Sequence, residues 1–338
     1  MVERRATATE GAFPGRRMRR LRRTPALRRL VAETRVVVDD LVAPVFVREG
    51  IDVPAPIAAL PGVFQHTVDS AVAEARALAG LGVPGLVLFG IPATKDAVGT
   101  AASAPDGIVQ VALRALRDAV GDDLVLIADC CLDEYTDHGH CGVLDVHGRV
   151  DNDATILRYG EVAVAQAEAG ADLVAPSGMM DGQVGAIRAA LDGAGHTGTA
   201  ILAYAAKYAS AFYGPFREAV GVEIAGGGDR RDYQQDPPNR REALAEVRLD
   251  LAEGADIVMV KPALHYLDVL VEVRRSVDVP VAAYHVSGEY AMLAAAAALG
   301  VVDRDAAVAE TLLAIKRAGA DFILTYFARS AAERLGGR

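Results

Sequence analysis

The 338-residue sequence has no tryptophan, three cysteines and only four lysines among its 35 basic residues. Its apolar runs are strand-sized and interrupted by charge, glycine or proline, so it predicts no helix long enough to span a membrane, which needs about 20 apolar residues. Cys130, Cys131 and Cys141 fall in one short segment. That spacing is a poor framework for structural disulfides and favours a metal site or a reducing, cytoplasmic setting.

Two of the four lysines stand where strand-like apolar runs end: Lys207 follows ILAYAA and Lys261 follows GADIVMV. An amine can lose its proton and attack a carbonyl, whereas a guanidinium cannot. An apolar run would also desolvate the ammonium and lower its pKa. The alternative is that both are ordinary charges reaching solvent, but two such sites favour amine chemistry. Lys95 and Lys316 have no apolar strand behind them, so we expect no lowered pKa there.

Charge is distributed unevenly along the chain. The net charge is −10, yet the first 35 residues hold eleven arginines against three glutamates, so the remainder is strongly acidic. A basic arm could bind nucleic acid, act as a transit peptide or wrap an acidic neighbouring subunit, while the lack of a following apolar segment argues against a cleaved signal peptide. An acidic body would repel DNA, so we favour a subunit-embracing arm over residues 1–40 and expect no nucleic-acid partner.

An internal repeat organises the rest of the chain. Three segments begin with Gly-Ala-Asp, at Gly170, Gly254 and Gly319. Each follows an alanine-rich helical pattern and opens a strand-like run, so each glycine is well placed to end a helix. The residue seven positions after the glycine is polar or reactive in all three copies: Ser177, Lys261 and Tyr326.

Eight strand-like runs separated by helical patterns predict a (β/α)8 TIM barrel over residues 41–338. A doubly wound open sheet is the alternative, but it would concentrate its site at one switch point, whereas polar residues here recur at many strand ends. Asp129 and Ser177 are two of these, and we expect them to orient the lysines or exchange protons. No nucleotide-binding fingerprint is found. The predicted strands are the runs after the three Gly-Ala-Asp segments and 43–47, 85–90, 124–129, 200–204 and 279–287.

The segment DCCLDEYTDHGHCG follows the third predicted strand and suits a metal. The thiolates of Cys131 and Cys141 with the carboxylate of Asp133 can bind zinc and leave one coordination position open, which is the catalytic arrangement. The alternative is that the cysteines are small buried apolar groups. Cys130 would point the other way in an extended chain, so we expect it in the core.

Several of these segments together resemble the porphobilinogen synthase (5-aminolevulinate dehydratase) family. The resemblance covers nearly the whole chain. It implies a lyase of tetrapyrrole and heme synthesis that condenses two 5-aminolevulinate molecules into porphobilinogen, with Schiff bases on Lys261 for the A-side substrate and on Lys207 for the P-side substrate. The segments are YAAKYASAFYGPFR, GADIVMVKPA, DCCLDEYTDHGHCG, GDRRDYQQDPPNRREAL, YHVSGEYAML and FGIPATKDAVGTAASAPDGIVQ.

The resemblance also assigns the substrate carboxylates. It implies that Arg217 and Arg230 hold the P-side carboxylate, where a guanidinium fork suits a carboxylate, and that Ser287 and Tyr326 hold the A-side one. Arg231 is the neighbour with which Arg230 is most easily confused. Residues from about 210 to 239, rich in glycine and proline, are expected to form a lid that excludes water.

Metals and assembly follow from the same resemblance. Family members carry either three cysteines with catalytic zinc, or alanine and aspartate with magnesium elsewhere; the order Cys131, Asp133, Cys141 departs from both. We expect zinc there, bound more weakly because a hard ligand replaces a soft one. Glu246 matches a carboxylate that binds an activating magnesium through waters, although it could be a simple exposed helix carboxylate. The arm implies a homo-octamer. The alternatives are a class I Schiff-base aldolase and a metal-binding barrel without catalysis.

Overall fold

The computed structural model describes Phe13, residues 16–225 and residues 228–336. Its contacts divide the chain into two units, with the boundary between Arg35 and Val36. In the first unit Thr24 caps α1 by accepting a hydrogen bond from the Leu27 amide at 3.1 Å, as expected of an N-cap threonine. The elements of this unit are the 3-10 helix η1 (Met18–Arg22) and α1 (Pro25–Leu30). Residues 1–12 and 14–15 of the expected arm lie outside the described residues.

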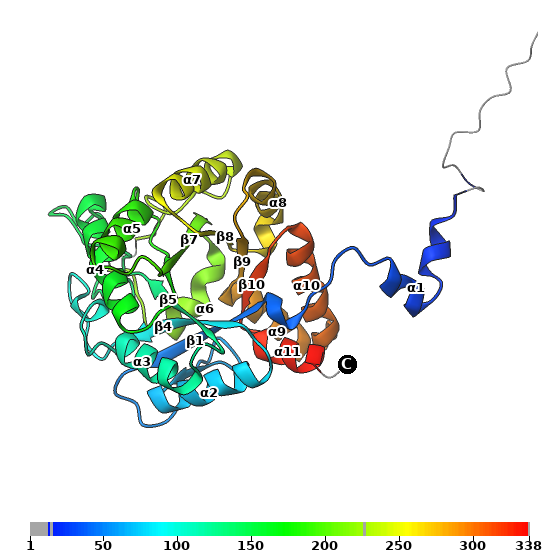
Figure 1. Cartoon of the computed structure of the whole chain (residues 1–338), viewed down its shortest axis with the longest axis horizontal. Coiled ribbons are helices and arrows are strands. Elements are labelled where there is room, and N and C mark those ends of the chain that lie inside the picture. Colours follow the sequence, from blue (N-terminus) through cyan, green and yellow to red (C-terminus); the bar gives the residue numbers. More distant parts are fainter. Residues whose placement is uncertain (1–12, 14–15, 226–227, 337–338) are drawn as a thin grey trace, which may run out of the picture. The chain divides into compact units, whose positions relative to one another are not determined.

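The second unit is a closed barrel of eight parallel strands (Figure 1). The ring closes where β1 pairs with β10, with Leu41 opposite Ile323. This confirms the predicted (β/α)8 fold and all eight predicted strands. The strands are β1 (Leu41–Arg48), β4 (Gly85–Ile91), β5 (Val125–Cys130), β6 (Leu173–Pro176), β7 (Ala200–Lys207), β8 (Ile257–Lys261), β9 (Val281–His285) and β10 (Phe322–Thr325).

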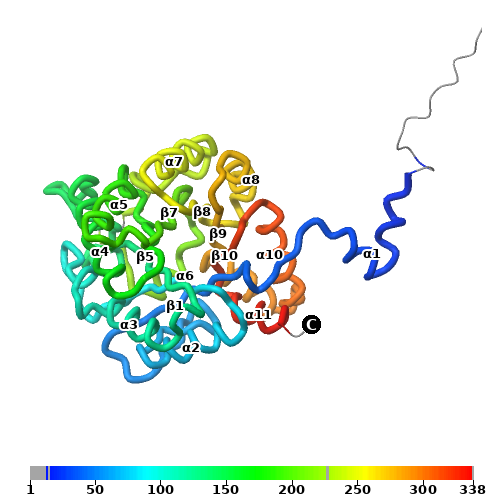
Figure 2. The backbone as a smooth tube through the Cα atoms, in the orientation of Figure 1, coloured from blue at the N-terminus to red at the C-terminus, as the bar shows by residue number. Residues whose placement is uncertain are grey.

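Helices cover the outside of the strand ring, as the backbone trace shows (Figure 2). Within the described residues none is both long and apolar enough to cross a bilayer. Short 3-10 turns, η2 (Val38–Asp40), η3 (Thr100–Ala102), η4 (Ala211–Tyr213) and η6 (Leu264–Tyr266), connect larger elements. The helices are α2 (Val68–Gly80), α3 (Ile108–Val120), α4 (Asn152–Glu168), α5 (Gln183–Gly193), α6 (Gly214–Ala219), α7 (Arg240–Glu253), α8 (Leu267–Ser276), α9 (Ser287–Ala298), α10 (Arg304–Ala318) and α11 (Ala328–Gly336).

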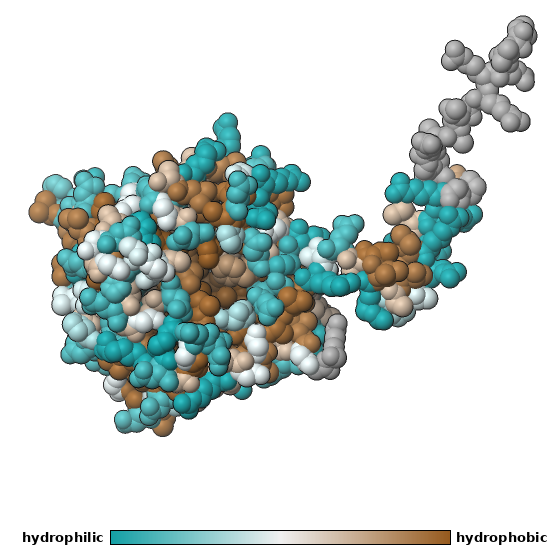
Figure 3. All heavy atoms as spheres, viewed as in Figure 1, coloured by the Kyte–Doolittle hydropathy of each residue, from teal (hydrophilic) through white to brown (hydrophobic). Residues whose placement is uncertain are grey.

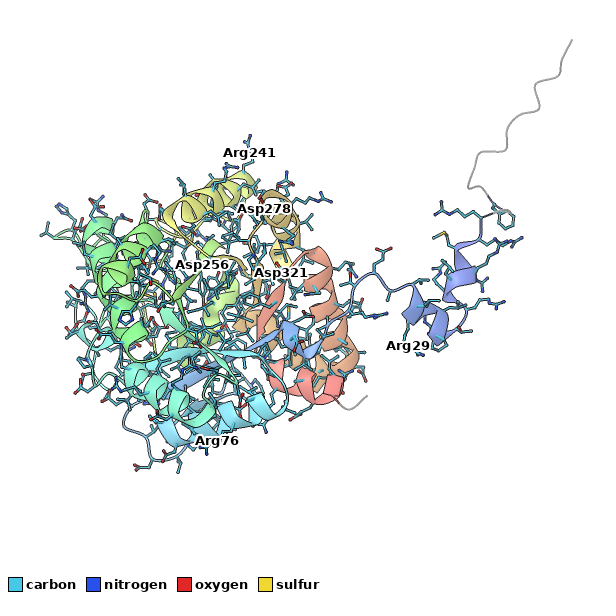
Figure 4. The ribbon with its side chains drawn as sticks, viewed as in Figure 1. Arg29, Arg76, Arg241, Asp256, Asp278 and Asp321 are labelled. Atoms are coloured by element: carbon cyan, nitrogen blue, oxygen red, sulfur yellow. The ribbon has the colours of Figure 1, made fainter. Side chains whose placement is uncertain are left out.

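The Gly-Ala-Asp repeat has a structural cause. Each glycine ends a helix with φ between 103° and 120°, a backbone region that favours glycine. Each aspartate then bonds the preceding barrel strand, so the repeat fixes how three strand pairs begin. Figure 4 places two of these carboxylates, Asp256 and Asp321, beside the strand ring and Arg76 and Arg241 at the outer rim. The three bonds, all 2.8 Å, run from the amides of Leu126, Ile201 and Val281 to Asp172, Asp256 and Asp321 respectively.

Two features of this unit were not expected. A short pair of strands, β2 (Ala55–Pro56) and β3 (Phe64–His66), extends the sheet beside β1. Val38–Asp40, expected in the arm, belongs to the barrel unit, where Asp40 forms an ion pair with Lys316 at 2.7 Å.

Hydrophilic residues dominate the rim of the barrel body, while hydrophobic residues show through toward its middle (Figure 3).

Candidate active site

A cavity of about 220 Å³ lies at the carboxyl ends of the barrel strands. The reactive side chains at the ends of β5, β7 and β8 line this cavity. Polar side chains that follow β6, β9 and β10 line it too. This is the end at which TIM barrels carry their active sites. All eight residues predicted to be catalytic or to bind substrate line this one cavity: Asp129, Ser177, Lys207, Arg217, Arg230, Lys261, Ser287 and Tyr326.

The two strand-end lysines lie side by side. Lys207 of β7 is directly opposite Lys261 of β8 in the parallel pairing. The pairing shifts register between Ala203 and Ala206, so β7 carries one extra residue there. Such a bulge re-aims side chains, and the Tyr204 ring and the Lys207 amine therefore lie close together although the two residues are three positions apart. The ring centre of Tyr204 lies 5.7 Å from Lys207 Nζ and 4.8 Å from Lys261 Nζ.

Lys261 is set up as a nucleophile. Burial, the largest cause, and the charge of Lys207 together lower its pKa to about 7, while Asp129 opposes the shift. The first cause was expected from the apolar run before Lys261, and the second is the ordinary effect of a like charge nearby. Near pH 7 about half of the amine is therefore neutral. Aromatic rings take the place of water around its Nζ at 4.5 to 5.5 Å: Tyr204, Tyr213, Phe216 and Tyr284.

Hydrogen bonds join Lys207, Ser177 and Asp129 in a chain. The Ser177 hydroxyl donates a 3.1 Å hydrogen bond to Asp129 Oδ2, and Lys207 Nζ donates to the Ser177 carbonyl. Burial raises the pKa of Asp129 to about 6, against the opposing charges of Lys261 and Lys207. A carboxyl with a pKa so close to neutrality is suited to exchange protons with groups bound beside the lysines.

The predicted metal ligands come together. Ligand atoms of Cys131, Asp133 and Cys141 lie within 4.8 Å of one another, and all three residues are buried. Two sulfurs and one carboxylate oxygen fit a zinc-like divalent cation. Burial alone would raise the pKa of Asp133, but the Arg230 guanidinium, 2.8 Å from its Oδ2, holds that pKa below its usual range. Cys130 is buried, its Sγ 3.7 Å from the Tyr159 carbonyl.

Arg230 and Arg231 differ clearly in how far their side chains are buried. Arg230 is nearly buried and also donates to the Gly139 carbonyl at 2.8 Å. The Arg231 side chain is 71% exposed and pairs with Asp229 at 3.5 Å. Arg217, on α6, is exposed and lines the cavity from the lid segment. The geometry therefore favours Arg230 over Arg231 for a buried carboxylate.

The predicted lid segment folds over the cavity through α6. The Phe216 amide on α6 donates to Ser287 Oγ at 3.0 Å, and the Tyr213 hydroxyl donates to the Lys261 carbonyl at 3.3 Å. The Tyr326 hydroxyl lies 3.2 Å from that of Tyr284. Gly226 and Gly227, part of the composition that predicted a lid, lie outside the described residues.

One expectation about the lysines was wrong. Burial lowers the pKa of Lys95, against the charges of Glu134 and Asp133, although no apolar strand precedes it. Its Nζ donates to the Gly221 carbonyl at 2.9 Å and to the Val220 carbonyl at 3.4 Å. The loop that carries Lys95 therefore holds the end of α6, a contact between distant segments that local sequence does not reveal.

Glu246 lies apart from the cavity. It is half-buried on α7, where burial and the charges of Asp181, Glu242 and Glu253 raise its pKa. Among the described residues it belongs to no cluster whose ligand atoms meet around one point. Ligation of magnesium by this residue stays a prediction.

Two cavity residues were missed at the sequence level. Gln234 is buried with its Nε2 unpartnered among the described residues, which suits an acceptor on a ligand. Glu134 is buried beside Asp133. Gln234 lies four residues after Arg230, which was the available indication that it could reach the same cavity. A glutamine in a loop matches no motif for ligand binding, so the sequence did not identify it.

The chain is similar to known proteins over nearly its whole length. The family model described as delta-aminolevulinic acid dehydratase matches residues 15–334. The chain belongs to this family. A delta-aminolevulinic acid dehydratase of Streptomyces coelicolor is 61% identical over 329 residues, covering 97% of this chain and 99% of the relative. One of Mycobacterium tuberculosis is 61% identical over 323 residues, covering 95% and 98%.

A solved delta-aminolevulinic acid dehydratase is also similar in structure. The enzyme of Toxoplasma gondii, in complex with the reaction product porphobilinogen, superposes with a TM-score of 0.92 at 44% identity. The match covers 94% of this chain and 91% of that one. Family membership therefore extends across the barrel and the cavity.

Proposed function

We propose that the chain condenses two molecules of 5-aminolevulinate into porphobilinogen with loss of two waters, as a lyase. The observation that carries this proposal is the pairing of Lys207 and Lys261 across adjacent strands in one cavity. A class I aldolase needs only one such amine. The Toxoplasma gondii relative, which holds porphobilinogen, supports the same substrate class.

Each lysine attacks the ketone of one substrate, forms an imine and releases one water. The protonated imine on Lys261 withdraws electrons, so the neighbouring carbon can lose a proton, which Asp129 is suited to accept. That carbon forms the carbon–carbon bond to the imine carbon held by Lys207. The amine of the substrate on Lys207 bonds to the carbon held by Lys261. Each lysine then leaves as a free amine, and the ring loses the matching protons as its double bonds form, which gives the pyrrole. Holding both ketones in one cavity replaces an encounter between two molecules by a positioned reaction.

The substrate carboxylates have two sets of partners. In this proposal Arg217 and Arg230, on the lid segment, bind one carboxylate, and Ser287 and Tyr326 bind the other; all four line the cavity. Arg230 also carries the ion pair to Asp133, so carboxylate binding and the metal loop share one guanidinium. Gln234 adds an amide donor on the same side.

Cys131, Cys141 and Asp133 would hold a zinc ion in this proposal. When bound, zinc supplies Lewis acidity that polarises a substrate oxygen or amine. Metal analysis after mild chelation, with activity restored by zinc but not by magnesium, is the expected result. Restoration by magnesium alone would reject the zinc assignment.

The activity is tested directly with 5-aminolevulinate. Porphobilinogen should form, and borohydride should trap substrate on Lys261 and Lys207, mapped by mass spectrometry. Absence of product from the wild-type chain would defeat the proposal. A single trapped lysine without porphobilinogen would favour the aldolase alternative, and metal binding without trapping would favour a non-catalytic barrel.

Assembly and regulation form a second part of the proposal. The arginine-rich arm on an acidic chain supports contact with a second copy, and family membership supports a homo-octamer. Removing residues 1–35 should reduce the mass measured by analytical ultracentrifugation. Glu246→Gln should abolish stimulation by magnesium if that residue holds the ion. The cytoplasmic location stays a prediction.

A further inference from the structure

Glu134 carries a buried carboxyl group in the barrel. Its residue is 2% exposed, and it lines the cavity. Within the described part of the chain, neither Oε1 nor Oε2 has a hydrogen-bond partner. An ionised carboxylate buried in this way is very costly unless a cation or a donor compensates it. Nothing in the proposed reaction uses this residue.

A second buried carboxylate nearby also has an unpartnered oxygen. Asp129 Oδ1 has no partner among the described residues. Ligand atoms of Asp129, Cys131 and Glu134 lie within 4.8 Å of one another, and all three residues are buried. Unpartnered oxygens of two carboxylates, gathered with a sulfur, form a site for a cation.

This set adjoins the one formed by Cys131, Asp133 and Cys141, and Cys131 belongs to both. In the second set, Asp133 Oδ2 already faces the Arg230 guanidinium at 2.8 Å. No ion pair within 4.0 Å reaches Asp129 or Glu134 in the described residues. The oxygens without a hydrogen-bond partner around Cys131 therefore belong to Asp129 and Glu134.

We propose that Glu134 is a ligand of the divalent cation held at Cys131, binding it through the carboxylate whose oxygens have no partner among the described residues. This inference rests on the metal binding proposed above and extends it to a residue outside the expected ligand set. With Glu134 the cation would have two thiolates, Cys131 and Cys141, and two carboxylates, Asp133 and Glu134, a mixed set that suits a borderline cation such as zinc or cobalt(II) better than a purely soft or a purely hard one. Glu134 adds a negative charge that offsets the loss of a third thiolate in this loop.

Cobalt(II) titration of metal-free protein tests the inference independently of activity. The variants are Glu134→Gln, which keeps the shape and removes the charge, and the matched control Asp137→Asn, an exposed carboxylate of the same loop. We expect Glu134→Gln to weaken cobalt binding by at least about tenfold and to change the visible d–d bands. The thiolate-to-cobalt charge-transfer band should be retained, and Asp137→Asn should match wild type in both respects.

The cobalt titration distinguishes failure of the proposed metal site from failure of the role proposed for Glu134. If wild type binds cobalt without a thiolate charge-transfer band, the metal site proposed under the function is wrong. If wild type shows that band and Glu134→Gln matches it in affinity and in d–d bands, only the role of Glu134 is overturned, and a bound proton compensates its carboxylate.

Thermal unfolding gives a second readout. Metal-free Glu134→Gln should unfold at the same or a higher temperature than metal-free wild type, because a buried unpartnered carboxylate has been removed. Saturating zinc should raise the unfolding temperature less in the variant than in wild type, because a ligand that binds the native state stabilises in proportion to its affinity. An equal rise in both proteins would overturn the inference.

Discussion

The two halves of the barrel mouth differ in chemistry. The half formed by β5 to β8 carries Asp129, Ser177, Lys207 and Lys261, which we call the reactive arc. The half formed by β9, β10, β1 and β4 carries the aromatic arc: Phe46, Phe89, Tyr284 and Tyr326. Its rings stack on one another, with Phe46 centred 5.4 Å from Phe89 and 6.1 Å from Tyr326.

The difference explains how one cavity can contain the Lys261 amine and also lower the pKa of that amine. In the proposed reaction the reactive arc supplies the groups that exchange protons or form bonds, and the aromatic arc with α6 excludes water from them. Burial is the largest cause of the lowered pKa of Lys261, and the charge of Lys207 is the second. The comparison therefore predicts that changes in either arc alter the same amine, by different routes.

Removing the amine itself should have the largest effect. Lys261→Ala should lower porphobilinogen formation by about ten-thousand-fold or more, a loss typical of removing a covalent catalyst. Borohydride trapping at this position should disappear. Lys316→Ala is the control, since Lys316 pairs with Asp40 away from the cavity and its loss should leave turnover near wild type. Full activity in Lys261→Ala would break the proposed division between the arcs.

Lys207→Met tests the coupling within the reactive arc. Turnover should fall roughly a thousandfold because one substrate is no longer held in place. In wild type, trapping at Lys261 should rise with pH through about 7, because only the neutral amine attacks. Without the Lys207 charge, which lowers the pKa of Lys261, this rise should move to higher pH. Trapping followed by mass spectrometry on both sides of pH 7 measures it, and an unchanged profile would remove Lys207 as a cause.

Phe89→Ala tests the aromatic arc. Phe89 is buried and packs on Phe46 and, at 5.1 Å, on Phe216. We expect a loss of about 3–5 kcal/mol in the free energy of unfolding. Water admitted to the cavity should raise the pKa of Lys261, so trapping at neutral pH should slow by up to about tenfold because less of the amine is neutral. Phe89→Leu, which keeps the site apolar, should retain the wild-type pH profile. A lost profile in both variants would point to general loosening.

The reactive arc was largely predictable from the sequence, whereas only Tyr326 of the aromatic arc was. Lys207 and Lys261 are marked by scarcity and by the apolar runs before them, and the Gly-Ala-Asp repeat placed Ser177, Lys261 and Tyr326 in one register. Phe46 and Phe89 sit within strands, where an aromatic residue indicates only core. Their role depends on the closure of β1 against β10, which no local pattern reveals.

The contacts that cross between loops were equally hidden. Lys95 holds the end of α6 over more than a hundred residues of sequence separation, and the Arg230 ion pair joins the lid segment to Asp133. The extra residue in β7 that aligns Lys207 with Lys261 also has no sequence mark. Such features follow from tertiary packing, which overrides local preference.

Tyr326→Phe is the finest test of the comparison, because Tyr326 belongs to the aromatic arc yet is predicted to bind a substrate carboxylate. The change keeps the ring stacked on Phe46 and removes the hydroxyl that lies 3.2 Å from the Tyr284 hydroxyl. Losing one hydrogen bond to a substrate carboxylate should raise KM by about tenfold while kcat changes little. Tyr284→Phe removes the other hydroxyl of the pair and should raise KM less, because the Tyr326 hydroxyl remains free to bind substrate. If both variants raise KM equally, the two hydroxyls act as one unit. If Tyr326→Phe changes neither parameter, the aromatic arc only excludes water, and the carboxylate is held elsewhere.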